Sequence, residues 1–102
     1  MTDLGDLTCE QFAGCLNQTF SLERPGADPL RLELIQVDPR GQFDPERDKR
    51  QAFSLLFRGP AEPLLPQAIY PLENTALGRL EIFLVPLGPD GEGGVRYEAV
   101  FS

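Results

Sequence analysis

The feature that most constrains the fold is the last quarter of the chain, Arg79–Phe101, in which two apolar stretches flank a turn rich in glycine and proline. The stretches read RLEIFLVPLG and VRYEAVF, and apolar residues recur at alternate positions as they do in β-strands. The segment between them, PDGEGG, supplies residues that tolerate a positive φ. The pattern predicts a β-hairpin. Because apolar residues occupy both phases of its first strand, we expect that strand to be buried on both faces, between a helix and the opposite wall of the sheet.

Upstream of this hairpin, four further stretches have the period of a β-strand, and they span residues 19–24, 30–37, 51–58 and 67–73. The apolar phase changes near Leu34–Ile35, which predicts a β-bulge there. Pro71 has no backbone N–H, so its strand belongs at an edge of the sheet or is paired on one side only at that residue. No convincing internal repeat relates these strands to one another.

A short helix is predicted near the N-terminus, from Cys9 to about Leu16. Thr8 and Gln11 have the spacing of a capping box, in which each side chain satisfies a backbone donor of the other residue. Leu7 and Phe12 occupy the two positions of a hydrophobic staple around that cap. The residues that we expect to point inward from this helix are Phe12, Ala13 and Leu16.

Together these elements predict one domain that spans residues 1–102. The fold class is α+β, with a small antiparallel β-sheet of about six strands that is curled or closed into a barrel. The short N-terminal helix packs on this sheet, because a helix of about eight residues is not stable by itself in water.

The charge of the chain excludes several classes of partner. The formal net charge is −7 and the pI is about 4.4, whereas nucleic acids and anionic membrane surfaces attract clustered lysine and arginine. We therefore expect no nucleic acid and no membrane among its partners. The N-terminus does not read as a signal peptide, and no apolar run approaches the ~18 residues of a membrane span. A cytoplasmic location follows as an expectation.

The residue types present also exclude much of catalytic chemistry. The chain has no histidine, so a Ser-His-Asp or Cys-His relay cannot be assembled. Two cysteines cannot build a four-thiolate zinc site, and their spacing on one helix places Cys9 and Cys15 too far apart for a disulfide. We expect no catalytic residue, no cofactor and no metal, and hence no enzyme.

The candidates for contacts with a partner or a ligand lie in two regions. The polar segment Asp38–Arg50 is typical of a long surface loop, and within it Phe43, Arg47 and Arg50 are the candidate contact residues. Outside this loop the candidates are Arg58, in the sequence Phe-Arg-Gly-Pro, and Tyr70.

Arg58 also has a structural interpretation. Its guanidinium could hold a carboxylate such as Glu98 or Glu73 in a bidentate contact that clamps two strands. Glu73, Glu81 and Glu98 are in turn best explained by cross-strand pairing with Arg79 and Arg96 on the solvent face. The acidic run after Pro89 is interpreted as a flexible hairpin connection.

The second half of the chain resembles a domain-of-unknown-function family of bacterial proteins. The resemblance rests on FRGP at 57–60, LPQ at 65–67, Tyr70, LE at 72–73, LG at 77–78, LEIFLVP at 80–86, GPD at 88–90 and YEAVF at 97–101. It covers about Phe53–Ser102, while the first half is similar only in its order of elements. The chain departs from the family pattern at Asn74-Thr75, where His-Pro is common.

The resemblance implies a fold and no established activity, and it associates some members with fibre or phage-tail-like proteins. From the residues and this resemblance we expect a non-enzymatic interaction or assembly domain whose partner is another protein. The binding features would be the Asp38–Arg50 loop, the Pro60–Pro66 segment and a strand edge near Pro71, and a homodimer formed by strand pairing is a further option. The alternative is a small-ligand-binding barrel that uses Arg58 and a tyrosine.

Overall fold

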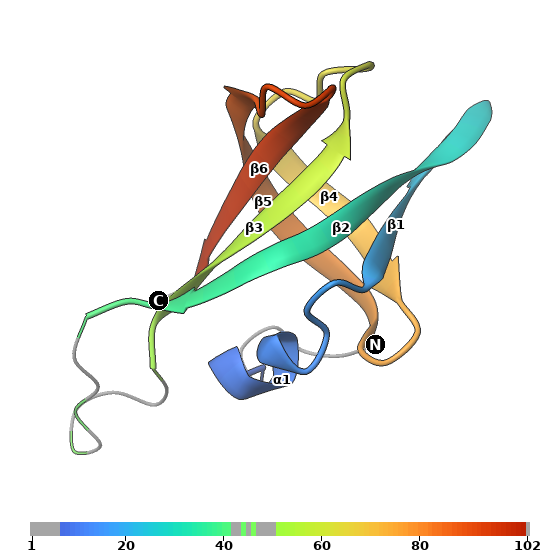
Figure 1. Cartoon of the computed structure of the whole chain (residues 1–102). Coiled ribbons are helices and arrows are strands. Elements are labelled where there is room, and N and C mark those ends of the chain that lie inside the picture. Colours follow the sequence, from blue (N-terminus) through green and yellow to red (C-terminus); the bar gives the residue numbers. More distant parts are fainter. Residues whose placement is uncertain (1–6, 42–43, 45, 47–50, 102) are drawn as a thin grey trace.

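The computed structural model describes residues 7–41, 44, 46 and 51–101, and it confirms the predicted fold class. Six antiparallel strands close into a barrel, and one short helix packs on it (Figure 1). The elements in chain order are α1 (Cys9–Ala13), β1 (Thr19–Arg24), β2 (Ala27–Pro39), β3 (Phe53–Pro60), β4 (Ala68–Asn74), β5 (Gly78–Pro89) and β6 (Gly94–Phe101). No helix among these elements is long and apolar enough to cross a membrane.

The barrel consists of two three-stranded meanders. Around the barrel the strand order is β1-β2-β3-β6-β5-β4, so β1–β2–β3 forms one half and β4–β5–β6 forms the other. The halves meet where β3 pairs with β6 over its whole length and where β1 pairs with β4 over two register positions only. The short β1–β4 ladder is therefore the weakest seam of the barrel.

The two meanders correspond residue by residue at their inward positions. In the first half Phe20 pairs with Leu32 and Leu22 pairs with Leu30. In the second half Tyr70 pairs with Ile82 and Leu72 pairs with Leu80. Each residue of the first set precedes its counterpart by 50 positions. The first two strands of each half therefore repeat one arrangement, which inspection of the sequence missed because few residues outside these inward positions are identical.

The interior of the barrel is filled by apolar side chains from every strand. Inward positions alternate with outward ones, as the period of a strand requires. The largest fully buried residues include Phe20, Leu32, Leu34, Phe57 and Ile82. Phe20 and Phe57 meet edge to face with ring centroids 5.2 Å apart, which fills the space between opposite walls.

The helix closes one end of this barrel. Thr8 and Gln11 form the predicted capping box, and Leu7 and Phe12 are both buried. The helix ends at Ala13, earlier than predicted, and Asn17 then takes a positive φ of 69°. Phe12 packs against Phe53 and Phe101, with ring centroids 5.6 and 5.4 Å away.

The predicted inward face of the helix is only partly correct. Ala13 is exposed and Leu16 is 43% exposed, whereas Cys15 is buried. The helix is shorter than its apolar pattern suggested, so residues beyond Ala13 no longer follow its rotation. The two cysteines are free thiols, as their spacing indicated.

The prediction that the first strand of the last hairpin is buried on both faces is wrong. In β5, Leu80, Ile82 and Leu84 are buried, but Phe83 and Leu87 are exposed. No described element covers that outer phase, because α1 packs on β2 instead. The second strand agrees with expectation, since Val95, Tyr97, Ala99 and Phe101 all point inward.

Two further details of the sheet follow the sequence. The β2–β3 register shifts between Leu34 and Gln36, where the bulge was predicted. Pro71 pairs with Glu81 of β5, and the β1–β4 ladder covers Leu72 and Glu73 but not Pro71. β2 starts at Ala27, three residues earlier than predicted, and the β1–β2 hairpin projects beyond the barrel as an arm (Figure 1).

Candidate functional site

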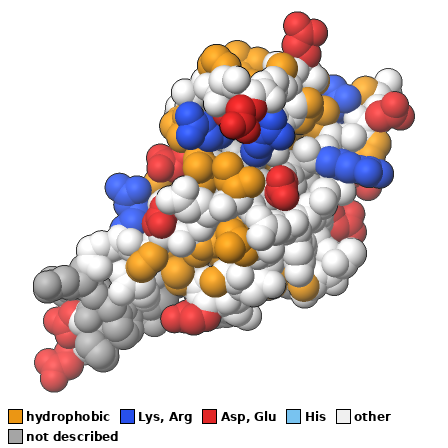
Figure 2. All heavy atoms as spheres, in the orientation of Figure 1, with side chains coloured by type: hydrophobic (Ala, Val, Ile, Leu, Met, Phe, Trp, Pro, Cys, Tyr) orange, Lys and Arg blue, Asp and Glu red, His pale blue; other side chains and the backbone are white. Residues whose placement is uncertain are grey.

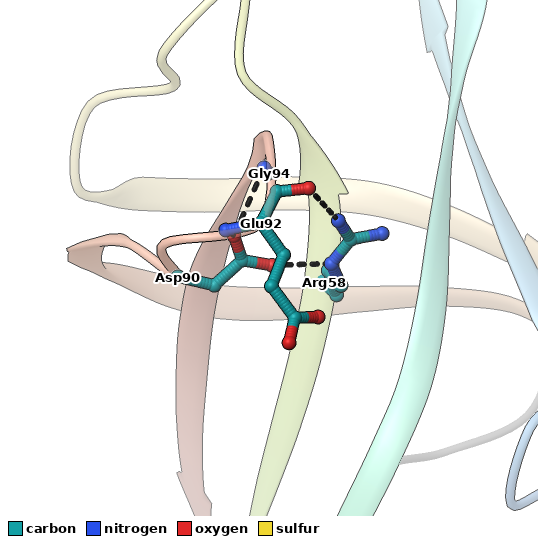
Figure 3. Close-up of polar contacts among 4 residues, drawn as sticks. All are labelled: Arg58, Asp90, Glu92 and Gly94. Atoms are coloured by element: carbon teal, nitrogen blue, oxygen red, sulfur yellow. Dashed lines mark hydrogen bonds and ion pairs between the residues drawn. The ribbon is translucent and has the colours of Figure 1, made fainter.

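Arg58 lies on the outer surface of β3 and joins that strand to the β5–β6 turn. Its Nε donates a hydrogen bond to the carboxylate of Asp90, with which it also forms an ion pair. Its Nη2 donates to the backbone carbonyl of Glu92 at 3.0 Å. Figure 3 shows the guanidinium facing both acceptors from the neighbouring strand. The side chain therefore acts as a clamp on the turn.

Asp90 is held from three sides. Its Oδ1 accepts hydrogen bonds from the backbone N–H groups of Glu92 at 2.7 Å and of Gly94 at 3.0 Å (Figure 3). The hydrogen bond from Arg58, followed by those two backbone bonds, lowers the pKa of Asp90 to about 2. The hydrogen bond with Asp90 in turn raises the pKa of Arg58. The carboxylate is therefore ionised at neutral pH and fixes the turn.

The predicted clamp is present, but its carboxylate belongs to Asp90 and not to Glu98 or Glu73. Glu98 instead lies 3.9 Å from Arg40, and Glu73 lies opposite Arg79 in the β4–β5 register. The acidic turn had been interpreted as a flexible connection, so its aspartate was overlooked. The Asp-Gly-x-Gly-Gly pattern of residues 90–94 was the available signal, because an aspartate before glycines can accept hydrogen bonds from the backbone that follows.

Gly94 leaves room for this clamp. A Cβ at Gly94 would lie 2.9 Å from the Cζ of Arg58 and 2.9 Å from the carbonyl oxygen of Gly59. The guanidinium thus packs directly against the backbone at the start of β6. Only glycine permits so close an approach.

Two tyrosines anchor residues 61–67, the segment that connects β3 to β4. The hydroxyl of Tyr97 accepts a hydrogen bond from the backbone N–H of Leu65 at 3.0 Å, and both residues are buried. The hydroxyl of Tyr70 donates to the carbonyl of Pro66. Burial, with a smaller contribution from Tyr97, raises the pKa of Tyr70. These contacts place Tyr70 in a structural role and leave its predicted role as a contact residue untested.

A group of large apolar side chains faces outward on the second meander. Ile69 of β4 lies directly opposite Phe83 of β5, and these side chains are 65% and 47% exposed. Leu87 is exposed further along β5, and Val100 is exposed on the adjacent strand β6. We call Ile69, Phe83, Leu87 and Val100 the outer apolar face. Sequence reasoning missed it because it assigned the phase of Phe83 to the interior.

The outer surface of β2, β3 and the start of β6 carries a mixture of charges. Figure 2 shows acidic and basic side chains next to each other at the end of the barrel where the turns lie, with hydrophobic side chains beside them. On this side Glu33, Arg58 and Arg96 follow one another across β2, β3 and β6. The two arginines are direct neighbours, so the carboxylate of Asp90 offsets a repulsion between like charges.

The remaining predicted contact residues, Phe43, Arg47 and Arg50, lie outside the described residues. Arg58 and Tyr97 cannot share an interior site, because Arg58 points outward from β3 while Tyr97 points inward from β6. The guanidinium is engaged by the turn, and the barrel interior is filled by side chains. The arrangement thus favours surface contact over enclosure of a small molecule.

One comparison with known proteins gives a match. The family model described as "Domain of unknown function (DUF6916)" matches residues 7–101, so the match includes the first half of the chain as well as the second. No curated protein and no solved structure matches the chain.

Proposed function

The chain belongs to the domain-of-unknown-function family DUF6916, and we propose that it is a non-enzymatic interaction domain that docks on another protein. The observation that carries this proposal is the outer apolar face. The role extends to that of an accessory to a fibre-like or phage-tail-like assembly, which the sequence resemblance suggests.

The exposed pair at the centre of this face supports binding energetically. Ile69 and Phe83 lie opposite each other in the ladder, so together they present one continuous apolar area. Burial of apolar surface is worth about 25 cal/mol per Å². Single exposed apolar residues are common on proteins, but adjoining ones on a sheet are typical of contact surfaces.

The framework behind these side chains is rigid enough to serve as a docking surface. β4 and β5 are paired along seven consecutive register positions. At the far end of β5, the clamp from Arg58 holds the turn to β6. A surface fixed before binding loses less conformational entropy when a partner docks.

The alternative of a small-ligand-binding barrel has less support. It requires Arg58 and a tyrosine to line one pocket, whereas Arg58 lies outside the barrel wall and Tyr97 lies inside it. The guanidinium also already has a carboxylate and a carbonyl as acceptors.

Affinity purification from the native host tests the proposal. The bait is the wild-type chain, and the test variant combines Ile69→Thr and Phe83→Thr, since threonine keeps a high strand propensity. The matched control is Gln36→Thr, which changes an exposed position on β2, the strand across the barrel from β5. We expect mass spectrometry to identify a protein that wild type and control retain and the double variant loses. Equal retention by all three baits, or no captured protein, would refute the proposal.

A further inference from the structure

A second surface, separate from the outer apolar face, lies along the short seam between β1 and β4. The two strands are paired only at Ser21–Glu73 and Leu22–Leu72. Toward the β1–β2 arm the ladder ends at Leu22–Leu72, and toward the β4–β5 turn Asn74 Nδ2 donates to the carbonyl of Thr19 at 3.1 Å. An open hollow of about 480 Å³ lies toward the β1–β2 arm, and another of about 560 Å³ lies toward the β4–β5 turn. A small hollow of about 10 Å³, lined in part by Ser21 and Pro71, lies at the seam and shares lining residues with both. We call the whole feature the seam groove.

Beside the hollow near the arm, where Pro71 forms part of the lining, the edge of β4 has unused backbone groups. Ala68–Pro71 of β4 pair with β5 on one side, and no described residue pairs with them on the β1 side. The N–H and C=O groups of a strand point alternately to its two sides. Four residues of extended chain span about 13 Å, which is enough for a short added strand. Pro71 limits the register of such a strand because it offers a carbonyl only.

The groove also carries more arginines than carboxylates. Arg24 and Arg79 line the hollow beside the arm, and Arg31 lines the other hollow. Arg24 donates from Nε and Nη2 to the carbonyl of Asp28, at 3.0 and 2.8 Å, which fixes its guanidinium without neutralising it. Among the described residues, no carboxylate lies within ion-pairing distance of Arg31 or Arg79.

These three arginines stand out in a chain whose net charge is −7. Glu23 and Glu73 line the same groove, so the groove is weakly basic whereas the whole molecule is strongly acidic. An extended segment with acidic side chains on one face would match both the unpaired edge of β4 and the excess of arginines beside it. Its backbone would pair with the β4 edge at Ala68–Pro71, and carboxylates spaced two residues apart would lie toward Arg24 and Arg79, which line the hollow beside that edge.

We propose that the seam groove binds an extended, carboxylate-bearing segment of another protein by adding it as a strand to β4. The two sites meet at Ile69, whose backbone lies on the β4 edge and whose side chain belongs to the outer apolar face. The peptide probes and Arg79→Gln leave that side chain in place, so either assignment can fail without the other. Pairing of the backbone gives the orientation, and the arginines select acidic side chains over basic ones.

The test is an NMR titration of the isotope-labelled protein with capped octapeptide probes. The first probe alternates threonine with glutamate, the second alternates threonine with lysine, and the third is the Thr-Glu peptide with alternate backbone nitrogens methylated. We expect saturable amide shifts at Glu23, Arg24, Ala68, Ile69 and Tyr70 with the first probe. The second and third probes should produce much smaller shifts. The Thr-Lys probe carries positive charge where carboxylates are needed, and the methylated probe lacks half of its backbone N–H donors.

Variants then locate the site. Arg79→Gln should lower the affinity for the Thr-Glu probe about three- to fivefold, the effect expected for the loss of one exposed ion pair. Arg96→Gln, an exposed change on β6 across the barrel from β1, should leave the affinity unchanged. The proposal is overturned if the shifts map outside the groove, if the Thr-Lys probe binds as well, or if both variants behave alike.

Discussion

At the scale of single residues, the best-defined feature is the clamp between Arg58 and Asp90. It joins two positions separated by 32 residues, and it uses the carboxylate and the backbone of the same turn. The presence of a fixed arginine before Gly59-Pro60 was predictable from the sequence. The identity of its partner was not, because the choice among several nearby acidic residues depends on which strands become neighbours.

This clamp predicts a specific dependence of stability on pH. The pKa of Asp90 is about 2 in the folded chain, below the value of about 3.9 for an unfolded aspartate. As pH falls, the unfolded state binds this proton first, so the contribution of Asp90 is complete above about pH 4 and is lost toward pH 2. Urea denaturation should show that the free energy of unfolding falls less between pH 5 and pH 2 for Asp90→Asn than for wild type.

Glu92→Gln is the matched control for that experiment. Its side chain lies in the same turn, but the clamp uses only its backbone carbonyl and N–H. The control should follow the wild-type pH profile. An Asp90→Asn variant whose profile also coincides with wild type would contradict the role assigned to the carboxylate.

A second residue-scale prediction concerns the hydroxyl of Tyr97. Tyr97→Phe would leave the buried N–H of Leu65 without its acceptor. Such a loss costs about 1–3 kcal/mol, measurable as a change in the free energy of unfolding. Tyr70→Phe removes a more exposed hydrogen bond and should cost less than about 1 kcal/mol. Equal losses in the two variants would argue against the anchoring role of Tyr97.

At the scale of elements, the strands were more predictable than the helix. Period-two patterns placed all six strands near their observed positions, since each strand has one face against the core. The patterns could not say which of two apolar phases of β5 is inward. That choice depends on where α1 docks, and the docking of a five-residue helix on β2 is a long-range outcome.

The helix gives a prediction at this scale. Phe12 supplies the buried side chain of α1 and contacts Phe53 and Phe101. We expect Phe12→Ala to cost about 3–5 kcal/mol in the free energy of unfolding. Hydrogen exchange should also accelerate across residues 9–16, because a helix this short needs its docking contacts. Ala13→Gln, at an exposed position of the same helix, is the control and should change neither quantity appreciably.

β3 gives another element-scale prediction. A Cβ at Gly59 would lie 2.5 Å from Cδ2 of the buried Leu32. Gly59→Ala should therefore destabilise the fold by about 1–3 kcal/mol through overpacking, measured by chemical denaturation. If Leu32→Ala is combined with it, part of that cost should be recovered relative to the sum of the two single changes. Strict additivity would mean that the two side chains do not compete for space.

At the scale of the whole molecule, two equivalent meanders form the barrel while their outer surfaces differ. The inward pairs match across the halves; for example, Phe20–Leu32 in the first half corresponds to Tyr70–Ile82 in the second. The outward positions do not, since Thr19 and Glu33 lie opposite each other in one half while Ile69 and Phe83 occupy the equivalent positions in the other. Burial constrains the core of both halves alike. Function is therefore best sought on the outer surface where they differ.

The molecule as a whole was predictable as far as its fold class. Alternating apolar residues and a capped short helix indicate a small antiparallel barrel. The outer apolar face was not predictable, because an exposed Phe83 and a buried one look the same in an apolar run such as IFLV. Solvent exposure is a property of the assembled barrel and not of the local pattern.

The central claim is that the outer apolar face contacts another protein, and site-specific photo-crosslinking in the native host tests it most directly. A photoreactive phenylalanine analogue is placed at position 83 and, as the control, at position 36 on β2. We expect a covalent adduct with one partner protein from position 83 and none from position 36. No adduct at position 83, or the same adducts at both positions, would contradict it.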